Sequence, residues 1–256
     1  MKETFTSISN MAIQKKTLVY KQTVSYLMLT MLGGMFVGFG IILLITIGGL
    51  LDPSAVPGMK VLQGLTFGVA LTMVIISGAD LFTGNNLIMT IGCLEKKTSV
   101  IDLIWVWIFS WIGNLIGSVL VALLYYYSGL YKGTILLYVQ KLVNYKIDPS
   151  FLELFCRGIL CNILVCLAVF CAYKLKNEAA KIVVIFCCIF PFITSGFEHS
   201  IANMTLFSIA YFILSTDSIS LLGFIHNLIP VSLGNAVGGA LFIGVAFWVS
   251  DKTIKS

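Results

Sequence analysis

The stretch SGFEHSIAN, Ser195 to Asn203, decides how this chain folds. It places an acid, a histidine and an asparagine between two apolar runs, VVIFCCIFPFIT before it and MTLFSIAYFIL after it. Hydrophobic residues make up 59% of the chain and charged residues 11%, whereas a soluble domain has about 45–50% and about 25%. Polar and ionisable groups in such surroundings predict a functional site inside a membrane protein.

Six mostly apolar runs have the length and composition that span a bilayer. The second and the fifth are interrupted. The runs are Val24–Leu51, Val61–Ile76 continued by Leu87–Cys93, Val100–Tyr127, Phe151–Tyr173, Ile182–Thr194 continued by Ser200–Leu214, and Asn227–Ser250. Residues 1–23 lack the apolar stretch of a signal peptide. Because Phe5, Ile8 and Ala12 fall at helical spacing, this segment predicts an ordinary amphipathic helix at the cytoplasmic surface.

The lysines predict the orientation of the chain. With six spans both termini lie on one side, together with the loops around 94–99 and 174–181. That side holds most of the lysines, namely Lys2, Lys15, Lys16, Lys21, Lys96, Lys97, Lys174, Lys176, Lys181, Lys252 and Lys255. The other side holds Lys60, Lys132, Lys141 and Lys146. The positive-inside rule therefore predicts a multi-pass protein of the inner (plasma) membrane with both termini in the cytoplasm.

The opening stretch has an echo, SGADLFTGN, in the interruption of the second run (Ser77–Asn85). Both read Ser-Gly, one residue, an acid, four residues and Asn. A second echo, GNLIG (Gly113–Gly117) and GNAVG (Gly234–Gly238), recurs at nearly the same distance along the chain. Two halves of three spans, about 24–127 and 150–250, must face opposite ways in the membrane. We expect one all-α domain over 1–256, with six transmembrane helices in an inverted 3+3 repeat and the second and fifth helices broken.

A broken helix at membrane depth predicts a binding site. After each break a half-helix restarts, and its N-terminus presents free N–H groups that favour an anion. Asp80 and Glu198 are expected to accept N–H bonds from their own loops and to hold the breaks in shape. Thr83 and His199 come from opposite halves, so the pseudo-twofold axis should bring them together. A histidine can exchange a proton near neutral pH.

At this point the sequence resembles a known family. SGADLFTGN, SGFEHSIANM (Ser195–Met204), RGILCNILVCLAVF (Arg157–Phe170) and NLIPVSLGNAVGG (Asn227–Gly239) are similar to signature segments of the formate/nitrite transporter family. The resemblance covers the whole chain. It implies an aquaporin-like six-helix protomer, a homopentamer, and one pore per protomer for small monovalent anions of weak acids. The chain is similar to the family's hydrosulphide channel, which favours hydrosulphide as cargo, with formate or nitrite as alternatives.

The resemblance also assigns pathway residues by motif. They are Thr83 and His199 at the centre, Lys146 in the outer vestibule, Asn162 and Val165 in the outer lining, and Asn235 as a hydrogen-bond partner of the histidine. Two apolar constrictions would involve Phe67, Leu71, Leu81 or Phe82, and Phe192. For these bulky positions plain core packing is the alternative. Arg157 has no counterpart in the family pattern, and an interfacial ion pair with Glu153 is its simplest interpretation.

Two other classes of function are alternatives. An aquaporin-like pore for neutral solutes fits the architecture, but the bulky side chains at the constrictions argue against it. A membrane enzyme using His199 with Glu198 is disfavoured, because neighbours in a helix point about 100° apart. The seven cysteines form no CxxC pair and are expected to be buried, reduced thiols, so neither a metal nor another cofactor is predicted. The sequence contains no basic patch interleaved with aromatic residues, so nucleic-acid binding is not predicted. The sequence leaves open whether the anion moves bare or with a proton.

Overall fold

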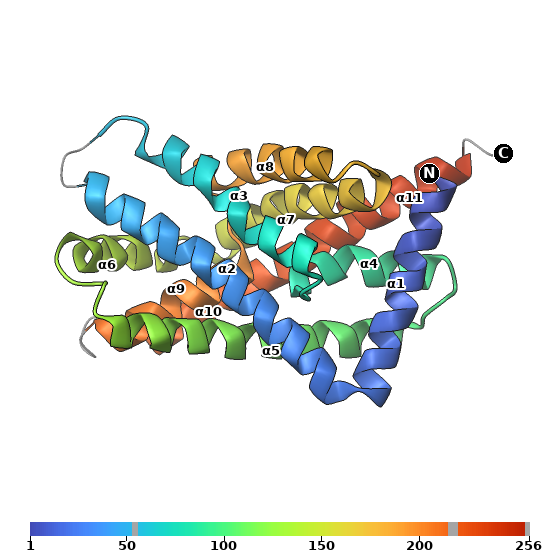
Figure 1. The fold of residues 1–256 in the computed structure, drawn as a ribbon, viewed down its shortest axis with the longest axis horizontal. Helices are drawn as coiled ribbons and strands as arrows, with labels where there is room; N and C mark the ends of the chain where they lie inside the picture. The colour runs from blue at the N-terminus through green and yellow to red at the C-terminus, as the bar shows by residue number, and fades with distance from the viewer. Residues whose placement is uncertain (53–55, 215–219, 254–256) are drawn as a thin grey trace.

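The computed structural model of this protein describes residues 1–52, 56–214 and 220–253, and all regular secondary structure in these ranges is helical (Figure 1). Five of the described helices are long and apolar enough to cross a bilayer. They are α2 (Thr23–Leu51), α3 (Met59–Ser77), α5 (Val100–Ser128), α7 (Phe151–Lys174) and the continuous helix Leu221–Thr253. Such helices are typical of a multi-pass membrane protein. Lys255, counted above among the lysines of the terminal side, lies outside the described residues.

Shorter helices complete the described fold. They are α1 (Lys2–Lys21), α4 (Phe82–Leu94), α6 (Thr134–Ile147), α8 (Glu178–Thr194) and α9 (Ser200–Ile213). The long C-terminal helix consists of α10 (Leu221–Val237), a π-helical segment (Gly238–Val245) and α11 (Ala246–Thr253). It begins earlier than predicted, because the Ser220 side chain accepts the N–H of Gly223 and caps it (3.0 Å). The apolar pattern did not predict α6.

Two short turns separate α3 from α4 and α8 from α9. The C-cap of α3, Gly78, has φ +76°, and Gly196 in the second turn has the same φ. Residues with a Cβ rarely adopt this left-handed conformation, whereas glycine ends each helix without steric strain. The chain then becomes extended at Leu81 (φ −130°) and at His199 (φ −114°), which are the N-caps of α4 and α9.

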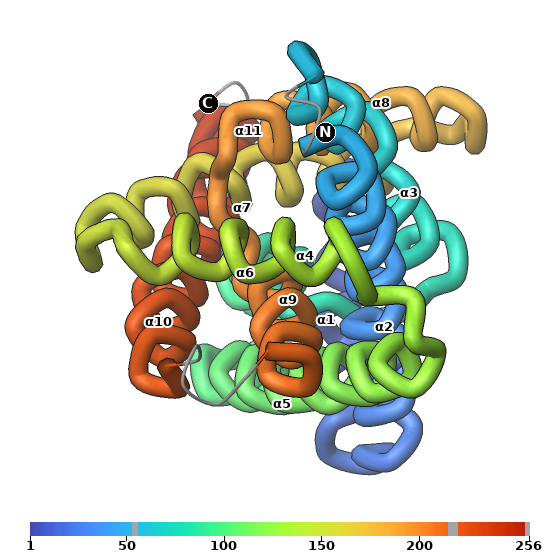
Figure 2. The backbone as a smooth tube through the Cα atoms, turned by 90° about the vertical axis from the view of Figure 1, so that its left-hand side faces the viewer, coloured from blue at the N-terminus to red at the C-terminus, as the bar shows by residue number. Residues whose placement is uncertain are grey.

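The two ends of the molecule differ. In Figure 1 α1 and α11 lie at one end and α6 lies at the opposite end, and Figure 2 shows α6 running across that end. The helix predicted for residues 1–23 is present as α1, and its apolar face lies against other helices of the protein. Helix α1 packs against α4, with Phe5, Ile8 and Ala12 buried, and Lys15 is buried as well. The N-terminal helix is therefore part of the core at its end of the protein.

Close helix packing explains the GNLIG and GNAVG motifs. Helix α2 packs on α5, and α7 packs on α10. A Cβ added at Gly113 would lie 1.8 Å from the Thr30 hydroxyl oxygen, and one added at Gly234 would lie 2.2 Å from the Phe155 carbonyl oxygen. Only glycine permits these approaches, which is the usual way that membrane helices come close. Each motif thus places its asparagine, Asn114 or Asn235, at a tight helix crossing.

Candidate functional site

Thr83 and His199 meet at the centre of the helix bundle. Thr83 lies in the first turn of α4, and His199 is the N-cap of α9. The Thr83 Oγ1 and the His199 Nε2 are 3.1 Å apart, and both residues are buried. Two residues far apart in sequence are therefore brought into hydrogen-bonding contact.

The other ring nitrogen determines the direction of this hydrogen bond. The backbone N–H of Ala202 donates to His199 Nδ1 (3.1 Å), so Nδ1 carries no proton. In the neutral ring the proton then resides on Nε2, which donates to the Thr83 hydroxyl oxygen. The Thr83 hydroxyl keeps its own proton to donate elsewhere. Protonating His199 would require breaking the hydrogen bond that caps α9.

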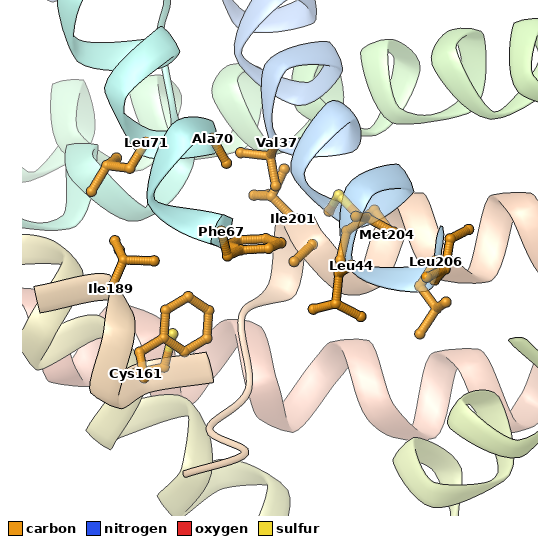
Figure 3. Packing of buried hydrophobic residues seen from close by; sticks show 14 of the residues in the cluster. Val37, Leu44, Phe67, Ala70, Leu71, Cys161, Ile189, Ile201, Met204 and Leu206 are labelled. Carbon is orange, nitrogen blue, oxygen red and sulfur yellow. The ribbon is translucent and has the colours of Figure 1, made fainter. Parts of the chain in front are cut away.

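Apolar side chains enclose a narrow lumen beside this pair. A central cavity of only about 10 Å³ is lined by His199 and by Val37, Phe67, Ala70, Leu71, Leu81, Val165, Ile189 and Phe192. Figure 3 shows Phe67, Ala70 and Leu71 of α3 in this region with Val37 and Ile189. The rings of Phe67 and Phe192 meet edge to face at 6.0 Å. Because a cavity needs about 10–15 Å³ to hold one water, passage of a solute larger than water requires these side chains to move.

Two larger cavities flank the central one. The α1-side cavity has a volume of about 380 Å³ and shares Leu71 and Leu81 with the central cavity. The α6-side cavity has a volume of about 240 Å³ and shares Phe192 and His199 with it. The three cavities therefore lie in series, with apolar side chains separating the outer two.

A buried ion pair lies beside the α1-side cavity. The Lys15 ammonium group contacts the Asp80 carboxylate, which also accepts hydrogen bonds from Tyr26 and Asn85. Lys15 and Asn85 line the cavity. The lysine neutralises the acid, so the wall of this cavity does not present a bare negative charge.

A matching ion pair lines the α6-side cavity. Lys146 Nζ lies 2.9 Å from Glu198 Oε2, and Asn203 Nδ2 donates to the same oxygen (2.6 Å). The expectation that both acids accept loop N–H groups is wrong, because side chains from other helices hold the carboxylates. Asn203 also donates to Asn227, which in turn donates to the Lys146 carbonyl and fixes the end of α6.

Asn114 and Asn235 brace the two turns with equivalent hydrogen bonds. Asn114 accepts the Phe82 N–H and donates to the carbonyls of Asp80 and Thr30 (2.6–2.9 Å). Asn235 accepts the Ser200 N–H and donates to the carbonyls of Glu198 and Gly158 (2.8–2.9 Å). The resemblance implied that Asn235 hydrogen-bonds the histidine, but it binds the backbone on either side of His199. It positions the histidine through the main chain.

The remaining predicted residues fall behind or beside the lumen. Asn162 is fully buried and donates to the Thr83 carbonyl and to Asn86 and Asn235, so it supports Thr83 and lies outside the cavity lining. Val165 lines the central cavity. Of the two alternatives at the constriction, Leu81 lines the lumen, whereas the Phe82 ring packs edge to face against Trp107 (6.3 Å).

The described residues include no group of three or more His, Cys, Asp or Glu side chains that could hold a metal ion. All seven cysteines are free, but the expectation that they are all buried is wrong, because Cys156 and Cys187 are exposed. Cys166 is buried beside the site and donates to the Thr83 carbonyl (3.2 Å), which adds a second support to this threonine.

Lys15, Tyr26 and Asn114 were not predicted from the sequence. Two signals could have found Lys15 and Asn114. A buried acid at Asp80 needs a cation, as Glu198 does, and the lysines of residues 1–23 are nearby candidates. The GNLIG and GNAVG echo already paired Asn114 with Asn235.

Comparison with known proteins places this geometry in context. The family described as Formate/nitrite transporter matches residues 2–249. The nitrite transporter NirC of Escherichia coli (strain K12) is 43% identical over 221 residues, 85% of this chain and 80% of that protein. A solved structure of an FNT family ion channel superposes with a TM-score of 0.92 at 38% identity, covering 98% of this chain and 99% of that chain. A pentameric formate channel with formate bound gives 0.77 at 28% identity, covering 90% and 98%.

Proposed function

The chain belongs to the formate/nitrite transporter family, whose members are transporters and channels rather than enzymes, and we propose that it conducts a small monovalent weak-acid anion across the membrane. The observation that carries the proposal is His199, hydrogen-bonded to the buried Thr83, in the wall of a narrow apolar lumen between two cavities, each with a lysine in its wall. Apolar rings exclude hydrated cations, and each lysine neutralises the neighbouring acid, so no bare carboxylate repels an anion.

The proposed architecture follows the sequence repeat. Helices α3 and α4 would form one interrupted span, and α8 and α9 another, within two inverted halves of three spans each. The matched hydrogen bonds of Asn114 and Asn235 support this assignment. We also propose a homopentamer with a pore in each protomer, as in the formate channel that the chain resembles. The lysine distribution supports termini in the cytoplasm of a cell whose inner membrane holds the protein.

The proposed mechanism keeps His199 neutral. An anion sheds most of its water at the apolar ring and receives hydrogen bonds from the Thr83 hydroxyl instead. His199 Nε2–H donates to the Thr83 oxygen and thereby polarises that hydroxyl. The Ala202 N–H occupies Nδ1, so the ring does not need to take up a proton for this role. A central charge is costly in hydrocarbon, about 2.5–3.5 kcal/mol or more, which these polar groups offset.

The proposed cargo is a small monovalent weak-acid anion, and three such anions are candidates. Hydrosulphide is our first candidate from the sequence resemblance, and nitrite and formate follow from the names of NirC and the formate channel. A pore for neutral solutes is the alternative. The central cavity of about 10 Å³ favours a small cargo and gives no support to glycerol.

The decisive experiment is a flux assay on the full chain in liposomes with hydrosulphide, nitrite, formate, chloride and glycerol. We expect weak-acid anion flux well above that of protein-free liposomes and little glycerol flux. Glycerol flux without anion flux would establish the neutral-solute pore. The native mass in mild detergent should be close to that of five chains, and a mass near one 28.0 kDa chain would contradict the pentamer.

A further inference from the structure

The Phe67 ring, which narrows the central lumen, lies between a glycine and a second aromatic ring. On one side it contacts Gly40 of α2, where an added Cβ would lie 3.2 Å from the Phe67 Cε2 and 3.3 Å from its Cζ. On the other side the Phe192 ring meets it edge to face, and the Phe192 centroid lies 5.9 Å from that of the His199 ring. All three rings line the central cavity. The Phe67 ring therefore occupies the space that a side chain at position 40 would need.

The same glycine determines how closely α2 approaches α3. A Cβ added at Gly40 would lie 2.7 Å from the Ala70 Cβ, whereas two carbon atoms pack best at about 3.5–4.0 Å. Gly40 is buried, and Figure 3 shows Phe67 and Ala70 of α3 near Val37 of α2. Both α3 residues line the central cavity. Gly40 thus lies directly behind two residues of the lumen wall.

The proposed inverted repeat provides an internal comparison for this contact. The Asp80 N–H donates to the Leu29 carbonyl (3.0 Å). The Glu198 N–H donates to the Arg157 carbonyl (3.2 Å), so α2 aligns with α7 and α3 aligns with α8. Two pairs of residues matched by this alignment all line the central cavity, Val37 with Val165 and Leu71 with Ile189. The alignment therefore holds at the lumen.

The equivalent positions in the second half carry a different pair of residues. Ala168 of α7 corresponds to Gly40, and Ile185 of α8 corresponds to Phe67. Both Ala168 and Ile185 are fully buried. One half therefore combines the smallest residue with a phenyl ring, and the other combines a methyl group with the smaller isoleucine side chain. This difference indicates that the glycine is matched to the Phe67 ring rather than required at this position in both halves.

We infer that Gly40 is a positioning residue that sets the width of the lumen through Phe67, and with it the largest anion that passes. A methyl group at position 40 would displace the ring away from α2, toward Phe192 and into the central cavity of about 10 Å³. Close-packed interiors do not absorb an added methyl group without such a shift. The inference rests on the proposed function, because it concerns which anions of the proposed class the pore conducts.

The test compares anions of different size in liposomes that hold the full chain. Hydrosulphide, nitrite, formate and acetate are supplied, and the flux ratio is taken between the largest and the smallest anion that the wild-type protein conducts. We expect Gly40→Ala to lower this ratio roughly tenfold, which corresponds to about 1.4 kcal/mol and lies within the range for overpacking a core. In a Phe67→Leu background the same change should alter the ratio by no more than about twofold, because the displaced ring is absent.

Gly49→Ala is the matched control on the same helix. Its Cβ would lie 2.6 Å from the Ile135 Cα of α6, and neither residue lines the central cavity. It should lower the melting midpoint and leave the flux ratio unchanged.

Three results would overturn the inference: an unchanged ratio in Gly40→Ala, an equal fall of the ratio in the Phe67→Leu background, or an equal fall in Gly49→Ala. If Gly40→Ala does not assemble to the native mass, combining it with Phe67→Leu should restore assembly. Failure of both would assign the overlap to Ala70 and overturn the role of Phe67. Lack of any anion flux in the wild-type protein would instead overturn the proposed function.

Discussion

The turn between α3 and α4 and the turn between α8 and α9 share one backbone plan but carry different side chains at the lumen. Each has a glycine with φ +76°, an acid, an extended N-cap residue and a bracing asparagine. The N-cap is Leu81 in the first turn and His199 in the second, and both line the central cavity. The two turns therefore have equivalent backbones. They differ at the N-cap position, which places an apolar side chain (Leu81) or a polar one (His199) in the cavity wall.

The cations that neutralise the two acids come from outside the repeat. Lys15 lies on α1, which precedes the proposed first half, and Lys146 lies on α6, which would connect the two proposed halves. The acids and asparagines are internal to the repeat. Two unrelated helices thus each supply a lysine that neutralises a buried acid. This indicates that each acid requires a nearby cation, whichever helix carries it.

The largest expected effect is the loss of either lysine. Lys15→Met and Lys146→Met each leave a buried carboxylate without its cation, and breaking such a pair lowers the free energy of unfolding by about 3–5 kcal/mol. We expect the larger loss for Lys146→Met, because the carboxylate left behind is 0% exposed at Glu198 and 5% exposed at Asp80. Thermal unfolding in detergent measures both. Lys97→Met, at an exposed lysine, is the control, and equal midpoints for all three variants would show that the pairs do not stabilise the fold.

The bracing asparagines test whether the two turns are equivalent. Asn114→Leu and Asn235→Leu each remove three buried hydrogen bonds to the backbone, with an expected loss of about 2–3 kcal/mol in unfolding free energy. The two losses should agree because the bonds are the same. Asn144→Leu, at an exposed site on α6, should leave the melting midpoint unchanged. A large loss in only one half would contradict the equivalence.

Converting the second turn to the first tests the functional difference between them. His199→Leu copies Leu81 and removes the hydrogen bond to Thr83, which should lower anion flux about 30-fold, or about 2 kcal/mol in the barrier. His199→Asn keeps a polar side chain that can cap α9 and should retain more flux than His199→Leu. Liposome flux of pentamers with native mass measures this. Full flux in His199→Leu would reduce the histidine to a packed core residue.

The smallest effect is expected at the glycines. Gly78→Ala and Gly196→Ala each force a Cβ into the left-handed region, which costs about 1 kcal/mol. Gly196→Ala should be slightly worse, because its Cβ would lie 3.4 Å from the Tyr145 hydroxyl, whereas nothing lies within 4 Å at Gly78. Small matched shifts in melting midpoint would support the shared backbone plan. An unchanged melting midpoint in either variant would show that the turn accommodates the added Cβ without strain.

Much of this protein could be predicted from the sequence because the relevant signals are local. Long apolar runs indicated membrane-crossing helices, and the motifs indicated the formate/nitrite transporter family, which the comparisons confirm. The echo of SGFEHSIAN singled out the two acids, and GNAVG singled out Asn235, which braces the second turn. Such residues are recognisable because helix breaks and close crossings demand particular residue types at fixed spacing.

The tertiary structure alone decided which distant side chains meet. Lys15 was counted only as a topology signal until α1 packed against α4 and buried it against Asp80. Leu81 faces the lumen and Phe82 faces Trp107, a choice that depends on where α5 lies. Asn235 binds the backbone around His199, and the Ala202 N–H sets the proton position on the ring. These outcomes depend on packing between helices far apart in sequence, and no local pattern encodes them.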